Sequence, residues 1–226
     1  MEALLNKIIP NIMSKPEIYW RSINETLVML GWSGIISFML GMFLGIILIV
    51  TQKGGVLQNA AISQTLDKVI NFFRSIPFIV LLAGLIPLTR MIMGTAIGVR
   101  GAIVPLVFGT TPFFARQVEA ALAEIDKGVI EAALASGSGP IGIIFRVYLK
   151  ESIASIARAT TITAISLIGL TAMAGAVGAG GLGDFAIRYG HQRNQIDVTY
   201  VTILTLVLLV SAIQIVGNII AKKSTH

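Results

Sequence analysis

Hydrophobic runs separated by short polar stretches dominate the pattern of this chain. Three of these runs carry no charged residue, and they cover 27–50, 159–183 and 198–221. A helix needs roughly 20 apolar residues to cross the hydrocarbon core of a bilayer, and each run reaches that length. The pattern therefore predicts three membrane-spanning helices at these positions. Within the first run, Gly41 and Gly45 form a G-x-x-x-G pair, which indicates close packing against another helix.

Two shorter hydrophobic runs lie between the first and the second of these helices. They cover Ser75–Thr89 and Gly101–Ala115, and an arginine stands directly before and after each one. Because the long apolar stem of arginine lets its charge reach the headgroups, the helices can extend past these residues, to about 62–90 and 95–117. This interpretation gives five membrane spans in an all-α fold. The alternative is a re-entrant pair, which leaves three spans.

The composition agrees with a membrane protein. The chain is 55% hydrophobic and 12% charged, with a mean hydropathy of +0.85, whereas soluble domains carry about 25% charged residues. The net charge of +6 comes from lysines and arginines that stand singly at the ends of apolar runs, which indicates membrane topology rather than nucleic-acid binding. Cysteine is absent, so disulfides, thiolate metal sites and thiol catalysis are excluded.

Five spans place the two termini on opposite faces of the membrane. With the C-terminus in the cytoplasm, the inner loops carry slightly more lysine and arginine than the outer loops, so the positive-inside rule favours an outer N-terminus. The first 25 residues lack the apolar core and cleavage site of a secretory signal, and we expect them to be retained. No internal repeat is visible, so we expect residues 1–226 to form a single transmembrane domain.

The longest polar stretch follows the third predicted span, at 118–157. Glu131–Ser136 is rich in helix-forming residues, and Gly137 is placed to end that helix in the left-handed conformation. Pro140 then fits the first position of a second helix. The stretch therefore predicts two short helices joined by a tight turn.

The second of these helices has an amphipathic pattern. From Ile141, apolar residues recur at Ile144, Val147 and Tyr148, and the basic residues Arg146 and Lys150 lie on another face. From the residues alone, a helix pair on the membrane surface and a docking element for a soluble protein are equally good interpretations.

This stretch resembles the EAA loop, the signature of permease subunits of bacterial ABC importers that work with a substrate-binding protein. The residues that match the motif are Glu131, Ala132, Ala133 and Gly137, followed by Val147-Tyr148-Leu149. The resemblance implies that the loop is cytoplasmic, and that a coupling helix around Pro140–Arg146, including Pro140 and Ile144, docks in a cleft of a separate ATPase subunit. The sequence departs from the family pattern at Asp126 and Lys150, where prolines are common, and this affects the helix boundaries.

Other segments are similar to the methionine importers within that family. They are Asn71–Phe78, Ile86–Arg90, Gly94–Gly98, Ala102–Leu106 and Thr171–Gly183. The resemblance implies a type I ABC importer fold and a homodimer of this permease in the bacterial cytoplasmic membrane. It also implies two ATPase subunits that bind ATP and Mg²⁺, and an extracellular binding protein, in many bacteria a lipoprotein, that delivers methionine. No cofactor is expected in this chain.

Candidate residues of the transport pathway lie in the second and fourth predicted spans. Met173 is the one bulky flexible side chain among small neighbours, so it either plugs a narrow pore or simply packs. Arg74 either faces the carboxylate of a substrate, anchors its helix at the interface, or pairs with Asp67. Ser75 and Pro77 follow Arg74 in the segment that resembles amino-acid permeases, and they are candidates for the same pathway.

A glycine-rich stretch ends the fourth predicted span. Its glycines match the dinucleotide fingerprint G-x-G-x-x-G, and they are Gly178, Gly180, Gly181 and Gly183. That fingerprint requires a strand before it in a soluble βαβ unit, whereas an apolar span precedes this one, and the nucleotide interpretation is therefore rejected. We expect a close-packed helix end, and the functional hypothesis is a hinge near the outer mouth of the pathway.

The chain contains no P-loop motif and no nucleophile–base set in a catalytic context. We therefore expect a transport subunit rather than an enzyme, with ATP hydrolysis on a separate chain. The alternatives are an ABC permease for another small amino acid or a methionine-containing peptide, and a self-sufficient channel or secondary transporter. The lack of a repeat, and of acidic residues deep in the spans, argues against the last class.

Overall fold

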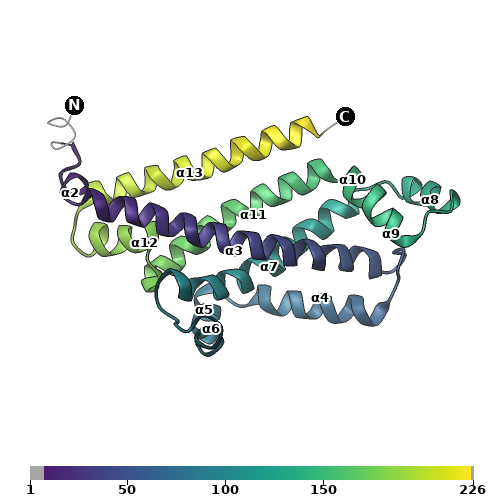
Figure 1. Cartoon of the computed structure of the whole chain (residues 1–226), viewed down its shortest axis with the longest axis horizontal. Helices are drawn as coiled ribbons and strands as arrows, with labels where there is room; N and C mark the ends of the chain where they lie inside the picture. The colour runs from purple at the N-terminus through teal and green to yellow at the C-terminus, as the bar shows by residue number, and fades with distance from the viewer. Residues whose placement is uncertain (1–7, 225–226) are drawn as a thin grey trace. The chain divides into compact units, whose positions relative to one another are not determined.

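Every regular element of the computed structural model is a helix, over the described residues 8–224 (Figure 1). In chain order the elements, with η for a π-helical turn, are α2 (Pro10–Met13), α3 (Pro16–Thr51), α4 (Ala60–Ser75), α5 (Phe78–Gly84), α6 (Ile86–Met93), α7 (Gly98–Ala123), α8 (Lys127–Ala135), α9 (Pro140–Ile143), η1 (Ile144–Tyr148), α10 (Leu149–Glu151), α11 (Ile153–Ala174), η2 (Gly175–Ala179), α12 (Gly181–Phe185), η3 (Ala186–His191) and α13 (Ile196–Lys223). The predicted all-α class is confirmed for this part of the chain. The ends of the predicted single domain, residues 1–7 and 225–226, lie outside the described residues.

Four helices among the described residues are long and apolar enough to cross a membrane. They are α3, α7, the segment Ile153–Ala179 and α13, and each overlaps one of the predicted spans. Only α3 begins much earlier than its uncharged run. It starts at Pro16, because proline suits the first position of a helix and the residues that follow continue the helical geometry.

The predicted span at 62–90 is not one helix. α4 ends at Ser75, and Ile76 is extended with ψ 124°, because the proline that follows it disfavours helical geometry. α5 and α6 then follow as short separate helices that are divided at Leu85. Neither reaches the length that crosses a bilayer, so the fifth span stays a prediction.

The described chain divides into two compact units, and each is assembled from three stretches of sequence. Unit 1 takes the described residues up to Ile35, together with Pro77–Val107 and Ala164–Ile213. Unit 2 takes Ile36–Ile76, Phe108–Thr163 and the described residues from Gln214 onward.

Two hydrophobic clusters form the core of unit 1. The larger one is buried between α3, α7 and the α11–η2 segment, and its members are Met29, Ala102, Leu106, Leu167, Ala174 and Ala179. The smaller one joins Phe185 of α12 to Val198 of α13 and to Ile12. Next to this cluster, the Asp197 carboxylate accepts hydrogen bonds from the backbone and side-chain N–H groups of Asn11, both at 2.9 Å. These contacts fix α12 and the start of α13 within unit 1.

Close packing of α3 against α7 organises unit 2. A Cβ on Gly41 would lie 2.8 Å from a ring carbon of Phe114, and a Cβ on Gly45 would lie 2.7 Å from the carbonyl oxygen of Ala115. The two glycines therefore let the helix backbones approach each other, as the G-x-x-x-G pattern predicts, and α7 is the partner. α4 joins the same unit through a buried cluster that contains Ile70.

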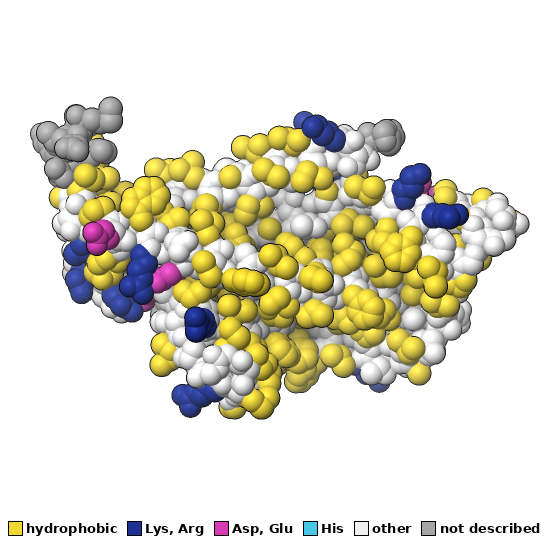
Figure 2. Space-filling model, viewed as in Figure 1, with side chains coloured by type: hydrophobic (Ala, Val, Ile, Leu, Met, Phe, Trp, Pro, Cys, Tyr) yellow, Lys and Arg dark blue, Asp and Glu magenta, His cyan; other side chains and the backbone are white. Residues whose placement is uncertain are grey.

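Hydrophobic side chains cover much of the visible surface (Figure 2). α13 is the most exposed of the four long helices, since few of its apolar side chains are buried. Leu204 and Leu208, for example, are 59% and 62% exposed. Apolar surface of this extent is unfavourable in water, so it indicates contact with lipid or with other membrane helices.

Candidate functional site

The polar stretch after α7 forms two short helices joined by a tight turn. Asp126 caps α8, because its carboxylate accepts a hydrogen bond from the backbone N–H two residues later at 2.6 Å. Gly137 ends α8 with φ 78°. The N–H of Gly137 donates to the carbonyl of Leu134 at 2.9 Å, and the N–H of Ser138 donates to that of Ala133 at 3.0 Å. This is the Schellman pattern, and the predicted left-handed terminator is confirmed.

The second helix begins at Pro140, as predicted, and continues through η1 to Glu151. Its inner face carries Ile143, Val147 and Tyr148, which are buried against side chains of α3 and α7. Burial also raises the pKa of the Tyr148 hydroxyl above its ordinary value. The predicted amphipathic pattern is confirmed except at Ile141, which was expected on the apolar face and is exposed, and the buried face fixes the helix to the body of unit 2.

Apolar side chains also face outward from this helix pair. Ile141 of α9 and Phe145 of η1 are 72% and 65% exposed. Leu134 of α8 adds a third apolar side chain that is 49% exposed. Exposed apolar groups surrounded by charged residues are typical of a protein-binding surface. Sequence reasoning placed Ile141 at the start of the apolar face that is buried, and it did not single out Phe145.

The residues of the sequence motif divide between this outer surface and the core of unit 2. Those exposed to solvent are Glu131, Ala132, Gly137 and Pro140. Ala133 and Ile144 are half-buried and pack against the buried cluster of unit 2. Ile144, which the resemblance implies as a docking residue, therefore supports the helix from inside, and its neighbours Ile141 and Phe145 are better placed to meet a partner.

Hydrogen bonds tie the end of this segment to α7. The Ser152 hydroxyl donates to the carbonyl of Ala121 at 3.3 Å, and the Ser155 hydroxyl donates to the carboxylate of Glu124 at 2.5 Å. Arg158 donates in turn to the Ser155 hydroxyl at 2.9 Å. These bonds therefore join the beginning of α11 to the end of α7.

At the other end of α11 the chain leaves helical geometry. Val177 and Gly178 are non-helical, and Gly178, Gly180 and Gly181 have φ 96°, 86° and 78°. A Cβ on Gly178 would meet open space, whereas a Cβ on Gly180, Gly181 or Gly183 would overlap neighbouring atoms. The structure therefore separates the four predicted hinge residues into one with room to move and three that mark close packing. Their role as a hinge stays a prediction.

Met173 lies at the end of α11 and is 44% exposed, although the next residue, Ala174, is fully buried. Packing inside the core of unit 1 therefore does not account for Met173. Its predicted role as a pore plug stays a prediction.

Arg74 and Ser75 end α4, and Pro77 precedes α5. Arg74 is exposed, and the Ser75 hydroxyl donates to a carbonyl of its own helix at 2.8 Å. The alternative in which Arg74 pairs with Asp67 is wrong, because the Asp67 carboxylate pairs with Arg116 of α7. A pathway role for Arg74, Ser75 and Pro77 stays a prediction.

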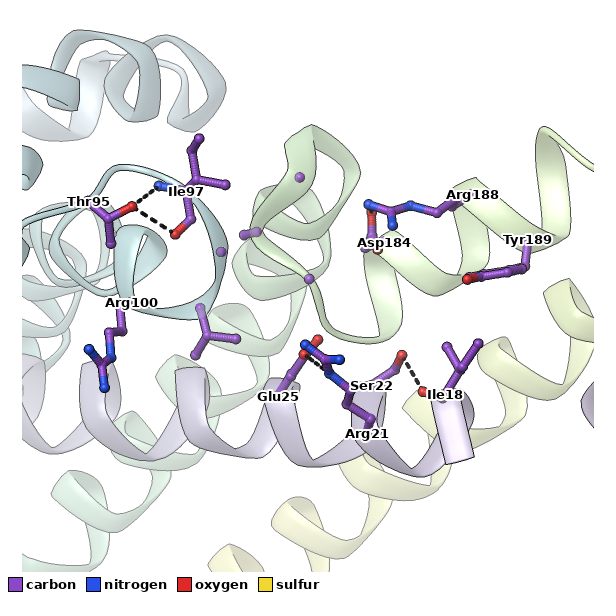
Figure 3. A pocket seen from close by; sticks show the side chains of 15 residues that line it. Ile18, Arg21, Ser22, Glu25, Thr95, Ile97, Arg100, Asp184, Arg188 and Tyr189 are labelled. Carbon is purple, nitrogen blue, oxygen red and sulfur yellow. Dashed lines mark hydrogen bonds and ion pairs between the residues drawn. The ribbon is translucent and has the colours of Figure 1, made fainter. Parts of the chain in front are cut away.

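Unit 1 also holds a cavity of about 510 Å³ that sequence reasoning did not anticipate. Figure 3 shows its polar lining, with Arg21 and Glu25 on α3 and Asp184 and Arg188 on the α12–η3 segment. Arg21 pairs with Glu25 at 2.8 Å, and Arg188 pairs with Asp184 at 3.0 Å. Each pair has the i, i+4 spacing of a helix, which the sequence displays, but the sequence does not reveal that α3 and α12 meet. Arg100 also lines the cavity, so its charged groups sum to a positive excess that attracts carboxylates.

Metal ligands do not gather in the described residues: no group of three or more His, Cys, Asp or Glu side chains there could hold a metal ion.

Comparison with protein families gives one match that covers most of the chain. The family described as binding-protein-dependent transport system inner membrane component matches residues 37–225. The probable D-methionine transport system permease protein MetI of Vibrio cholerae is 45% identical over 202 residues, which are 89% of this chain and 90% of that protein. The methionine import system permease protein MetP of Bacillus subtilis is 43% identical over 217 residues, which are 96% of this chain and 97% of that protein.

Solved structures with the same fold are also transporter chains. A chain of the MetNI methionine ABC transporter, from a structure of its inward facing conformations, has a TM-score of 0.92 and 44% identity, and the match covers 94% of this chain and 99% of that one. A chain of an amino acid ABC transporter has a TM-score of 0.78 at 16% identity, and this second likeness shows the fold alone.

Proposed function

Because the chain belongs to the family of binding-protein-dependent transport system inner membrane components, we propose that it is the permease subunit of an ATP-driven importer for methionine. The observation that carries the proposal is the 43% identity to a methionine import system permease across 96% of the chain. The similarity to a chain of a methionine ABC transporter, at 44% identity, supports the same substrate.

In this proposal the helix pair after α7 docks on a separate ATPase subunit. Ile141 and Phe145 provide the apolar contact, and Glu131 provides a charged group on the neighbouring helix α8. The opposite face of the second helix, with Ile143 and Val147, is buried in unit 2. One short helix therefore binds the partner with its outer face and transmits displacement to the permease with its inner face.

The complete importer contains two copies of this permease, two ATPase subunits with ATP and Mg²⁺, and an extracellular binding protein. ATP binding closes the ATPase pair and draws the two docking helices together. The membrane helices then open outward to receive methionine from the binding protein, and hydrolysis returns them to the inward state. Transport follows because ATP and the binding protein each stabilise one of the two states more than the other.

The pathway residues fit this cycle as follows. Met173 forms a narrow constriction, and Gly178 is the point about which the segment after α11 bends, since its surroundings are open. Arg74, with Ser75 and Pro77, lies at the break between α4 and α5, where an exposed guanidinium can attract the carboxylate of an amino acid. Replacing Met173 by alanine is expected to leak solute or to raise uncoupled ATP hydrolysis.

Five membrane crossings are part of the proposal. The four long helices supply four of them, and the broken segment α4–α6, which is second in chain order, supplies the other. This arrangement places the N-terminus outside and the C-terminus in the cytoplasm, and it puts the docking helices in the cytoplasm. Labelling of intact cells with a membrane-impermeant thiol reagent tests the orientation. We expect the reagent to label a cysteine added beside the N-terminus of the permease and not a cysteine added beside its C-terminus.

Transport in proteoliposomes tests the proposed function. The permease is reconstituted with its ATPase and its binding protein, and uptake of labelled L-methionine is measured with and without ATP. We expect ATP-dependent uptake that Glu131→Arg abolishes. Glu17→Arg, a charge reversal at an exposed position in the first turn of α3, serves as the matched control and is expected to transport normally.

The other outcomes point to other functions. If the sealed complex hydrolyses ATP but transports no methionine, the chain is still an ABC permease, and its substrate is another amino acid or a methionine-containing peptide. Solute flux without any ATPase would replace the importer by a channel or a secondary transporter.

A further inference from the structure

Two side chains of α3 cap the start of α12, which lies 156 residues later in the chain. The Glu25 carboxylate accepts a hydrogen bond from the N–H of Gly181 at 2.8 Å through Oε2. The Thr26 hydroxyl accepts one from the N–H of Leu182 at 2.8 Å. N–H groups in the first turn of a helix have no partner within that helix, so α12 depends on α3 for these two bonds.

Both acceptors are held in place by bonds within α3. The Thr26 hydroxyl donates its proton to the carbonyl of Ser22 at 3.0 Å, which leaves its oxygen lone pairs free to accept. The second carboxylate oxygen of Glu25 accepts a hydrogen bond from Nε of Arg21 at 2.8 Å, and this ion pair also balances the charge of Glu25. Each acceptor therefore makes one bond within its own helix and one bond to α12.

The glycine segment, residues 175–183, has a backbone that comes close to these two acceptors. Gly180 and Gly181 have φ 86° and 78°, which side-chain-bearing residues rarely adopt. A Cβ on Gly180 would lie 2.6 Å from the Glu25 carboxylate, and a Cβ on Gly181 would lie 2.7 Å from the Thr26 hydroxyl. Two of the five glycines in residues 175–183 are therefore explained by the approach of Glu25 and Thr26 to the backbone.

We propose that Glu25 and Thr26 are positioning residues that latch the glycine segment 175–183 in the conformation described here, and that the latch opens when the permease turns outward. The inference rests on the proposed transport function. α11 follows the segment α8–α10 that we propose to dock on the ATPase, which we call the docking loop, and it runs directly into residues 175–183. A movement that displaces α11 therefore pulls on the two bonds. Single hydrogen bonds suit this role, because losing one shifts a two-state equilibrium by about tenfold rather than irreversibly.

The absence of cysteine from the chain permits a direct test. A single cysteine in place of Ala179, which is only 8% exposed within the segment, reports whether the segment opens. Its labelling by a membrane-impermeant maleimide is measured in proteoliposomes that contain permease and ATPase, without methionine. We expect Thr26→Val and Glu25→Ala each to raise the labelling rate of the nucleotide-free complex about tenfold, toward the rate of the ATP-bound parent.

Matched variants separate the latch from general disruption. Thr26→Ser retains the acceptor oxygen and is expected to label at nearly the parent rate. Glu25→Gln keeps one of the two acceptor oxygens and is expected to label at a rate between those of the parent and Glu25→Ala. Thr202 is also buried and also donates to its own helix, at 2.8 Å to the carbonyl of Val198, so Thr202→Val should not label faster.

Two results would overturn the latch. One is unchanged labelling in both Thr26→Val and Glu25→Ala, and the other is an equal rise in Thr202→Val. Because the measurement uses no methionine, absent methionine uptake by the parent would refute the proposed substrate and leave the labelling result intact.

Discussion

Replacing Gly137 by alanine isolates the energetic contribution of one backbone conformation in the docking loop. Gly137 has φ 78°, and a Cβ there would meet nothing within 4 Å, so the substitution introduces no clash. The cost that remains is that of holding an L-residue in the left-handed region, about 1–2 kcal/mol. This cost opposes the two hydrogen bonds of the turn, from the N–H groups of Gly137 and Ser138. The turn should therefore open about 5- to 30-fold more often.

Hydrogen exchange measures that opening directly, because the exchange rate of a bonded amide follows the population of its open state. We expect the amides that close the turn to exchange about 5- to 30-fold faster in Gly137→Ala. Gly137→Asn should show a smaller effect, because asparagine tolerates the left-handed region better.

Gly142 offers the matched control, five positions along in α9. It has ordinary helical geometry, and a Cβ there would meet only the Ser138 side chain at 4.0 Å. Alanine is the better helix former by about 0.5–1 kcal/mol, so Gly142→Ala should slow exchange slightly. Equal exchange in Gly137→Ala and the parent, or the same acceleration in both alanine variants, would refute the reasoning.

Three further substitutions test the packing and the docking surface. Phe145→Asp, at a 65% exposed position, is expected to weaken ATPase binding by about 30-fold or more without changing the melting temperature, and unchanged affinity in a titration of purified subunits would remove Phe145 from the interface. Ile143→Ala removes a side chain that is 0% exposed, so the unfolding free energy should fall by about 2–5 kcal/mol, and a melting temperature equal to the parent's would contradict the assignment of Ile143 to the core. Gly45→Ala places a Cβ 2.7 Å from Val118 and should lower stability by about 1–3 kcal/mol, whereas Gly31→Ala meets open space and serves as its control in the same melting experiment.

Local features of the docking loop were predictable from the sequence because their chemistry is local. The end of α8 at Gly137 follows from the freedom of glycine to adopt positive φ, and the start of α9 at Pro140 follows from the fixed φ of proline. The side of the helix that meets a partner was not predictable to the same accuracy. The π-helical turn over Ile144–Tyr148 changes the residue period, so a face extrapolated from regular helix geometry is displaced.

Tertiary relations explain the other differences. We predicted one span at 62–90 because its apolar run is bounded by arginines. Pro77 disfavours helical geometry at the residue before it, and in the structure α4 ends there. The bonds of Glu25 and Thr26 to α12 join positions 156 residues apart, and nothing in the local pattern of either segment indicates them. The run of glycines indicated that another part of the protein packs closely against this backbone. The structure identifies the side chains that do so as Glu25 and Thr26.

ATP-dependent uptake of labelled L-methionine into proteoliposomes is the most direct test of the proposed import function. We expect uptake that requires this permease, its ATPase and its binding protein together, and that stops when Glu131→Arg disrupts the docking loop. Methionine uptake that continues without the ATPase, or that Glu131→Arg leaves unchanged, would contradict that function.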